Sequence, residues 1–125
     1  MPLILIVEDN PLDADMLSRR LLRKGYEVVV APDGESGISL AEERRPDIII
    51  MDMGLPGIDG WEATRRIRQS PLTAAIPVIG LSAHAMAEDR DRGLAAGCDC
   101  YETKPLEFDR LVAALETLIR KGNRP

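Results

Sequence analysis

The most constraining feature of this sequence is a set of short apolar runs that each end in a reactive polar group. Three runs span residues 3–7, 48–51 and 76–81, and a fourth ends near residue 104. The groups at their ends are carboxylates, a hydroxyl and an amine, namely Glu8, Asp9, Asp52, Ser82 and Lys104. Because the carboxyl ends of parallel strands meet at one edge of an open α/β sheet, we expect these groups to form one site there.

The apolar runs alternate with stretches of helical spacing, and this alternation predicts a parallel sheet. The first helix has the clearest limits, because Asn10 suits its N-cap, Pro11 its first turn and Gly25 its end. The same kinds of signal place a strand at 26–30 and helices at about 35–44 and 59–69.

The last helix is predicted by an apolar stripe from Phe108 to Ile119 at steps of three and four residues. The stretch from Met86 to Ala96 is poorer, because charged residues leave Met86, Leu94 and small alanines to bury. We therefore expect the helix in this stretch to be loosely held.

A chain of 125 residues fits one domain, which we expect over residues 1–121 with a C-terminal tail at 122–125. Its 16 basic and 21 acidic residues give a net charge of −5. This charge disfavours nucleic acid as a direct partner, because phosphate binding needs a concentrated basic face. The apolar run at 1–7 is too short for a signal or membrane segment, so we expect no membrane association and a cytoplasmic location.

In that compartment, Cys98 and Cys100 remain reduced thiols. Together with the single histidine, His84, they would supply three metal ligands, fewer than a closed zinc site needs. We expect the two cysteines to pack beneath a helix as small, weakly polar residues, with both side chains on one face of a strand.

Carboxylates gathered at one sheet edge repel one another, which either raises a pKa or recruits a cation. Magnesium is the natural candidate, because it takes one or two carboxylates, keeps several waters and is often completed by a phosphate oxygen. A carboxylate at this edge can itself be the nucleophile toward a phosphoryl group. The Lys104 ammonium would then neutralise developing charge, and the Ser82 hydroxyl would hydrogen-bond a phosphoryl oxygen.

Four segments in this order resemble the receiver domains of bacterial two-component response regulators over essentially the whole chain. They are Leu5–Asn10 (LIVEDN), Met51–Gly60 (MDMGLPGIDG), Leu81–Ala83 (LSA) and Tyr101–Pro105 (YETKP). Each segment alone is a weak signal, whereas the four together are highly specific. The resemblance implies an α/β fold of the flavodoxin-like type, with a doubly wound sheet of five parallel strands in the order 2-1-3-4-5 and five helices.

The resemblance also implies roles at matching positions. Asp52 would accept a phosphoryl group from a histidine kinase or a histidine phosphotransfer protein. Glu8, Asp9, Asp52 and the backbone carbonyl of Gly54 would hold Mg²⁺, and Lys104 would pair with the phosphate. The chain would then be a switch that is chemically modified, and no enzyme with a separate substrate.

Ser82 and Tyr101 would form the switch itself. Once Ser82 moves to the phosphate, space opens for the Tyr101 ring to turn inward, and a protein-binding surface changes. A simpler interpretation is that Tyr101 packs one way permanently. The sequence names no downstream partner that would bind this surface.

Three further residues take their roles from the same resemblance. A cis peptide bond before Pro105 would aim Lys104 inward. Gly54 and His84 would border the phosphoryl group and tune the rate of dephosphorylation. For His84, an exposed loop histidine is the simpler interpretation.

Two other classes of protein use related chemistry or a related fold. A magnesium-dependent phosphatase of the haloacid dehalogenase type also forms an aspartyl phosphate, but its D-x-D motif needs a second acid where this chain has Gly54. A flavin mononucleotide module shares the sheet, but its first phosphate loop is neutral, whereas Glu8 and Asp9 make this loop acidic.

Within the receiver interpretation, the chain is either a free-standing regulator or a receiver domain excised from a hybrid histidine kinase or a multidomain regulator. The start at Met1 and the short tail favour the first. A free-standing regulator of this kind would act through protein contacts as a monomer or weak dimer.

Overall fold

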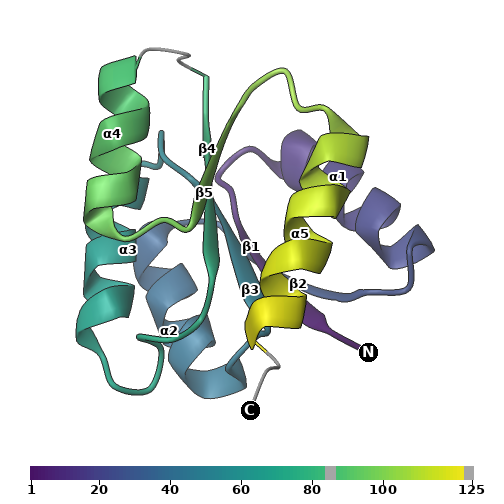
Figure 1. Ribbon diagram of the computed structural model, residues 1–125, viewed down its shortest axis with the longest axis horizontal. Coiled ribbons are helices and arrows are strands. Elements are labelled where there is room, and N and C mark those ends of the chain that lie inside the picture. The colour runs from purple at the N-terminus through teal and green to yellow at the C-terminus, as the bar shows by residue number, and fades with distance from the viewer. Residues whose placement is uncertain (84–86, 123–125) are drawn as a thin grey trace.

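The computed structural model describes residues 1–83 and 87–122 and contains a five-stranded parallel sheet. The strands are β1 (Leu3–Val7), β2 (Glu27–Ala31), β3 (Ile48–Asp52), β4 (Val78–Ser82) and β5 (Cys100–Thr103). Their order is β2-β1-β3-β4-β5, so the predicted strand order is confirmed. The carboxyl ends of the strands all lie at the upper edge of the sheet in Figure 1, opposite the two chain ends.

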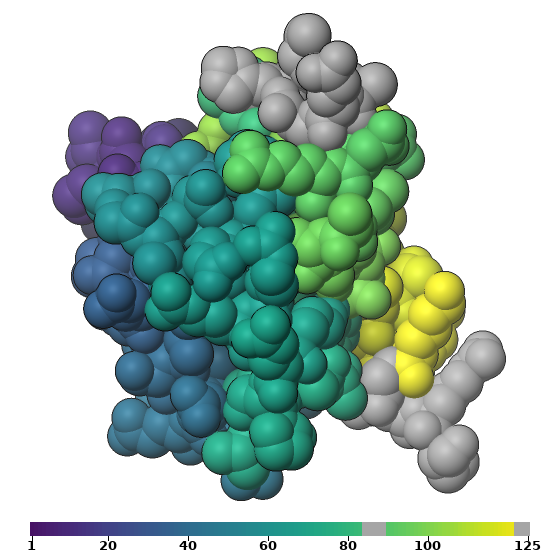
Figure 2. Space-filling model, turned by 90° about the vertical axis from the view of Figure 1, so that its left-hand side faces the viewer, coloured from purple at the N-terminus to yellow at the C-terminus, as the bar shows by residue number. Residues whose placement is uncertain are grey.

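Helices cover both faces of this sheet. They are α1 (Pro11–Arg23), α2 (Gly34–Arg44), α3 (Gly60–Gln69), α4 (Ala87–Ala96) and α5 (Phe108–Gly122). Helices α1 and α5 lie on one face, and α2, α3 and α4 lie on the other (Figure 1). Figure 2 looks onto the second face, where α4 lies beside α3.

Side chains from alternate positions of each central strand fill two core layers. On the α2–α3–α4 face the strands contribute Leu5, Ile49 and Met51, and on the α1–α5 face they contribute Ile4 and Ile50 among others. Because β1, β3 and β4 are buried on both faces, their sequences are continuous apolar runs. The runs therefore end abruptly in polar groups where the strands leave the core.

The prediction that the side chains of the two cysteines lie on one face of the sheet is wrong. Cys98 lies in the core layer under α3, with its Sγ 3.9 Å from Thr64 Oγ1, whereas Cys100 packs in the layer under α1 and α5. The prediction was wrong because β5 begins only at Cys100, so strand alternation does not reach Cys98. Burial raises the pKa of the Cys98 thiol to about 11, which keeps it protonated.

Helix α4 agrees with the prediction at Ala96, one of the small alanines, but not at Leu94. The expectation for Met86 lies outside the described residues. Leu94 is 43% exposed, and Gly93 and Ala96 face the core in its place. A large apolar side chain is therefore absent from the described core-facing positions of α4. The loose attachment of this helix stays a prediction.

Candidate functional site

The ends of β1 and β3 bring three carboxylates together. Val7 pairs with Met51 in the parallel register, so Glu8 and Asp9 leave the sheet beside Asp52. One carboxylate oxygen from each of Glu8, Asp9 and Asp52 lies within 4.8 Å of the others. Glu8 and Asp52 are buried, and Asp9 is exposed. Three convergent carboxylate oxygens are hard ligands of the kind that Mg²⁺ prefers, so this donor set fits the metal expected from the sequence.

Lys104 extends from the end of β5 into the same cluster. Its Nζ donates to Glu8 Oε1 and to Asp52 Oδ2, both at 3.1 Å. The peptide bond between Lys104 and Pro105 is cis, as expected. Although burial alone would lower the pKa of Lys104, the hydrogen bonds to Asp52 and Glu8 outweigh it and raise that pKa. The ammonium therefore remains charged beside the two carboxylates.

The two buried carboxyl groups have opposite pKa shifts. Burial, and to a lesser extent the neighbouring Asp52, raises the pKa of Glu8 to about 7. Burial would also raise the pKa of Asp52, but hydrogen bonds from Glu8, the Gly54 amide and Lys104 lower it overall. In the absence of metal the pair thus keeps a proton on Glu8 below about pH 7.

This shift predicts a pH dependence of stability in the presence of a metal chelator. The folded protein holds the Glu8 proton up to about pH 7, whereas the unfolded chain releases it near 4.5. The resulting stabilisation is complete below pH 4.5 and is lost as pH rises through 7. The Glu8→Gln variant mimics the protonated group, so at pH 8 its free energy of unfolding should exceed that of wild type. We expect a difference of about 2 kcal/mol, less than the full shift implies, because solvent screens part of the interaction.

Urea denaturation at pH 5 and pH 8 in EDTA measures this difference. The difference in free energy of unfolding between Glu8→Gln and wild type should be smaller at pH 5 than at pH 8. Replacing EDTA with saturating Mg²⁺ should restore the stability of wild type at pH 8. Equal pH slopes for the two proteins in EDTA would contradict the assignment of the proton to Glu8.

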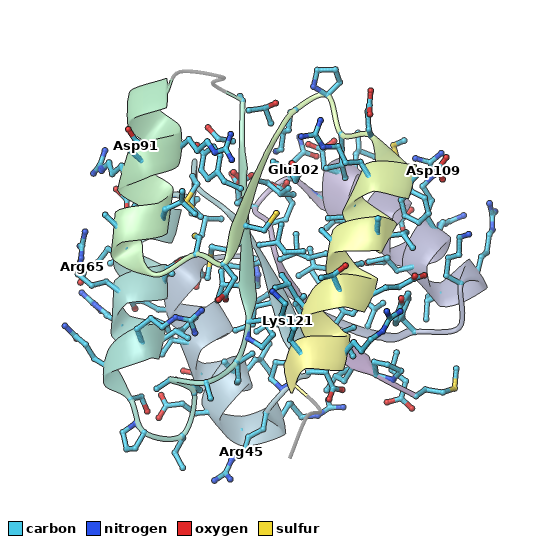
Figure 3. The ribbon with its side chains drawn as sticks, in the orientation of Figure 1. Arg45, Arg65, Asp91, Glu102, Asp109 and Lys121 are labelled. Atoms are coloured by element: carbon cyan, nitrogen blue, oxygen red, sulfur yellow. The ribbon has the colours of Figure 1, made fainter. Side chains whose placement is uncertain are left out.

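Ser82 and Tyr101 come from the adjacent strands β4 and β5. Ser82 is buried at the end of β4, and its carbonyl accepts a hydrogen bond from the Lys104 amide at 2.8 Å. Strand alternation directs Tyr101 toward α4 and Glu102 toward α5 (Figure 3 labels Glu102). There the Glu102 carboxylate forms an ion pair with Arg110. The Tyr101 ring already lies inside the core in this conformation.

Gly54 lies directly beside the carboxylate of Asp52. Its amide donates to Asp52 Oδ1 at 2.9 Å, and a Cβ placed at position 54 would lie 3.7 Å from that oxygen. The glycine therefore leaves space next to the carboxylate. The expectation for His84 falls outside the described residues.

Two glycines that support the loop at 53–59 have no role in the sequence-based prediction. A Cβ at Gly60 would collide with the carbonyl oxygen of Asp52 and with Met53 Cα, and its amide donates to the Met53 carbonyl at 3.1 Å. A Cβ at Gly34 would lie 2.7 Å from Ile58 Cγ1. Helices α3 and α2 thus begin against this loop. Gly60 closes the Met51–Gly60 motif, so a signal for it was present in the sequence.

Comparison with known proteins finds response regulators and their receiver domains. Residues 4–116 match the family model described as the response regulator receiver domain. The chain is 39% identical over 124 residues to the DNA-binding dual master transcriptional regulator RpaA of Synechocystis, covering 99% of this chain and 52% of that protein. It is 34% identical over 119 residues to protein PilH of Pseudomonas aeruginosa, covering 95% and 98%. This chain therefore spans about half the length of several transcriptional regulators it matches and nearly all of PilH.

A solved structure with a bound metal is also similar. It is the receiver domain of a sensor histidine kinase from Pseudomonas aeruginosa, with a magnesium ion coordinated in its active-site cleft. The TM-score is 0.88 and the sequence identity 38%, with 94% of this chain and 97% of that chain covered.

Proposed function

Since this chain belongs to the response regulator receiver domain family, whose members are switches of two-component signal transduction, we propose that Asp52 is its phosphoryl acceptor. The observation that carries this proposal is the position of Asp52. Its carboxylate lies in a cluster with those of Glu8 and Asp9, and Lys104 Nζ lies 3.1 Å from its Oδ2.

Each neighbour has a task when Asp52 acts as the nucleophile. A carboxylate oxygen of Asp52 forms the new bond to phosphorus, while the bond from phosphorus to the donor's leaving group breaks. Glu8, Asp9, Asp52 and the Gly54 carbonyl would hold Mg²⁺, which would neutralise charge on the phosphoryl oxygens. Before ion binding, Glu8 releases its proton to solvent.

The cation and the hydroxyl act on the product. Lys104 exchanges a carboxylate contact for a phosphoryl oxygen, and the Ser82 hydroxyl donates to another oxygen. When Ser82 moves to the phosphoryl group, the Tyr101 ring changes its position in response. We propose that Gly54, whose amide lies beside the Asp52 carboxylate, and His84 set how fast water removes the phosphoryl group.

The partners follow from this chemistry. The phosphoryl donor is a histidine kinase or a histidine phosphotransfer protein, and the output is a changed protein-binding surface on the domain at residues 1–121. DNA binding is a property named for RpaA, of which this chain covers 52%, and we do not extend it to this chain. None of the helices in the described ranges is long and apolar enough to cross a membrane.

Phosphorylation by a small donor tests the proposal. Incubation with acetyl phosphate and Mg²⁺ should add the mass of one phosphoryl group, and EDTA should abolish the addition. Asp9→Asn keeps the nucleophile but removes a metal ligand, so half-maximal labelling should require more Mg²⁺. Labelling that is unaffected by EDTA, or no labelling at saturating Mg²⁺, would refute the proposal. Intact-protein mass spectrometry measures each result.

A further inference from the structure

The buried ring of Tyr101 lies between two glycines that belong to different elements. A Cβ built on Gly93 of α4 would lie 2.7 Å from Tyr101 Cδ2 and 2.9 Å from Cε2. A Cβ on Gly80 of β4 would lie 3.2 Å from Cδ2. Real Cβ atoms do not approach other heavy atoms within 3.0 Å. A side chain at position 93 and the inward ring therefore exclude each other.

The backbone of α4 does not itself require glycine at position 93. Glycine in a helix interior is less favourable than alanine, and Gly93 is not among the glycines with positive φ. Asp91, labelled on α4 in Figure 3, is exposed, and two residues further along the helix Gly93 lies on the opposite, buried side. The missing side chain is thus accounted for by the ring that it faces.

Helix α4 contacts α3 through Arg92, the residue before Gly93. The Arg92 guanidinium stacks over the Trp61 ring, 4.1 Å from its centroid, and lies 3.9 Å from Asp59 Oδ2. Asp59 caps α3 by accepting from the Glu62 amide, and it also ends the loop that follows Asp52. Helix α4 therefore contacts the Tyr101 ring through Gly93 and, through Arg92, the residue Asp59 that ends the loop after Asp52.

We propose that Gly93 is the gate for Tyr101: its missing side chain lets α4 close over the inward ring, and a larger residue forces the ring out to solvent. The inward ring with α4 closed is one state, and the outward ring is the other. The gate acts in the unphosphorylated chain, so this inference stands independently of the role of Asp52.

Chemical modification of the two tyrosines tests the gate. In wild type, tetranitromethane should nitrate buried Tyr101 slowly and the half-buried Tyr26 faster. In Gly93→Ala, Tyr101 nitration should rise severalfold while Tyr26 nitration stays unchanged, as measured by peptide mass spectrometry. Continued protection of Tyr101, or an equal rise at both tyrosines, would overturn the proposal, because the second result indicates general loosening.

A double-mutant cycle tests the same contact through stability. Gly93→Ala should lower the folding equilibrium constant at least about tenfold in the wild-type and Tyr101→Phe backgrounds, because both keep the ring. In the Tyr101→Ala background the same change should be neutral or stabilising, as helix propensity predicts. Ala95→Gly at an exposed position of α4 calibrates that propensity. Equal effects of Gly93→Ala in all backgrounds would overturn the gate, and the nitration result decides if Tyr101→Ala does not fold.

Discussion

Asp52→Asn is expected to abolish phosphorylation by acetyl phosphate at any Mg²⁺ concentration. The amide has the shape of the carboxylate, and its oxygen can still accept the hydrogen bond that the Gly54 amide donates at 2.9 Å. It has no nucleophilic carboxylate oxygen and removes one negative ligand from the metal site. The loss should therefore be chemical, and intact-protein mass spectrometry should find no added phosphoryl group.

The fold should survive this substitution. Asp52 and Glu8 are both buried acids, and the charge of Asp52 contributes to the raised pKa of Glu8. Neutralising Asp52 removes that repulsion while Lys104 keeps its contact with Glu8 at 3.1 Å. Urea denaturation in EDTA should give a cooperative transition for Asp52→Asn and wild type alike. A phosphoryl group that persists on the folded variant would assign the acceptor elsewhere.

The sequence predicted the sheet well because the physics of that part is local. A strand buried on both faces needs a continuous apolar run, and its end is visible where Glu8, Asp52 or Ser82 interrupts the run. The order of the strands in the sheet could not be predicted from the runs in this way. It followed from the resemblance to receiver domains, since pairing between strands depends on contacts that no single run encodes.

The sequence could not predict contacts between residues far apart in the chain. Gly93 looks like a weak point of α4 until the Tyr101 ring is placed against it. Arg68 donates to Asp99 Oδ2 at 2.7 Å across 31 residues, which ties α3 to the turn before β5. In each case the residue type is ordinary and only its tertiary neighbour gives it a role.

The site shows the same division between local and tertiary information. Repulsion among carboxylates predicted that one pKa would rise or that a cation would bind. Which carboxylate keeps the proton depends on the donors around it. Asp52 receives the Gly54 amide and Lys104 and stays ionised, whereas burial dominates at Glu8. The two donors come from the ends of β3 and β5, and the hydrogen bonds that they make to Asp52 were not predictable from spacing.

Lys104→Met should slow phosphorylation and strengthen Mg²⁺ binding at the same time. The ammonium donates to both Glu8 and Asp52 at 3.1 Å, so it competes with the metal for the same carboxylates. Without it the acid cluster carries more uncompensated charge, and Mg²⁺ affinity should increase. The charge that develops on the phosphoryl oxygens then lacks its cation, and the labelling rate should fall by about 100-fold, a typical effect of removing one stabilising donor.

The opposite directions of the two changes separate this role from general damage. A distorted site would show both a lower Mg²⁺ affinity and a lower labelling rate. Loss of a competing cation instead raises the Mg²⁺ affinity and lowers the labelling rate. Lys104→Arg is the matched control, because it keeps the positive charge and should leave Mg²⁺ affinity closer to wild type. Isothermal titration with Mg²⁺ and the time course of acetyl phosphate labelling measure the pair. A rate within about twofold of wild type for Lys104→Met would mean that Mg²⁺ alone neutralises the transferred group, since a donor in the transition state contributes far more than that.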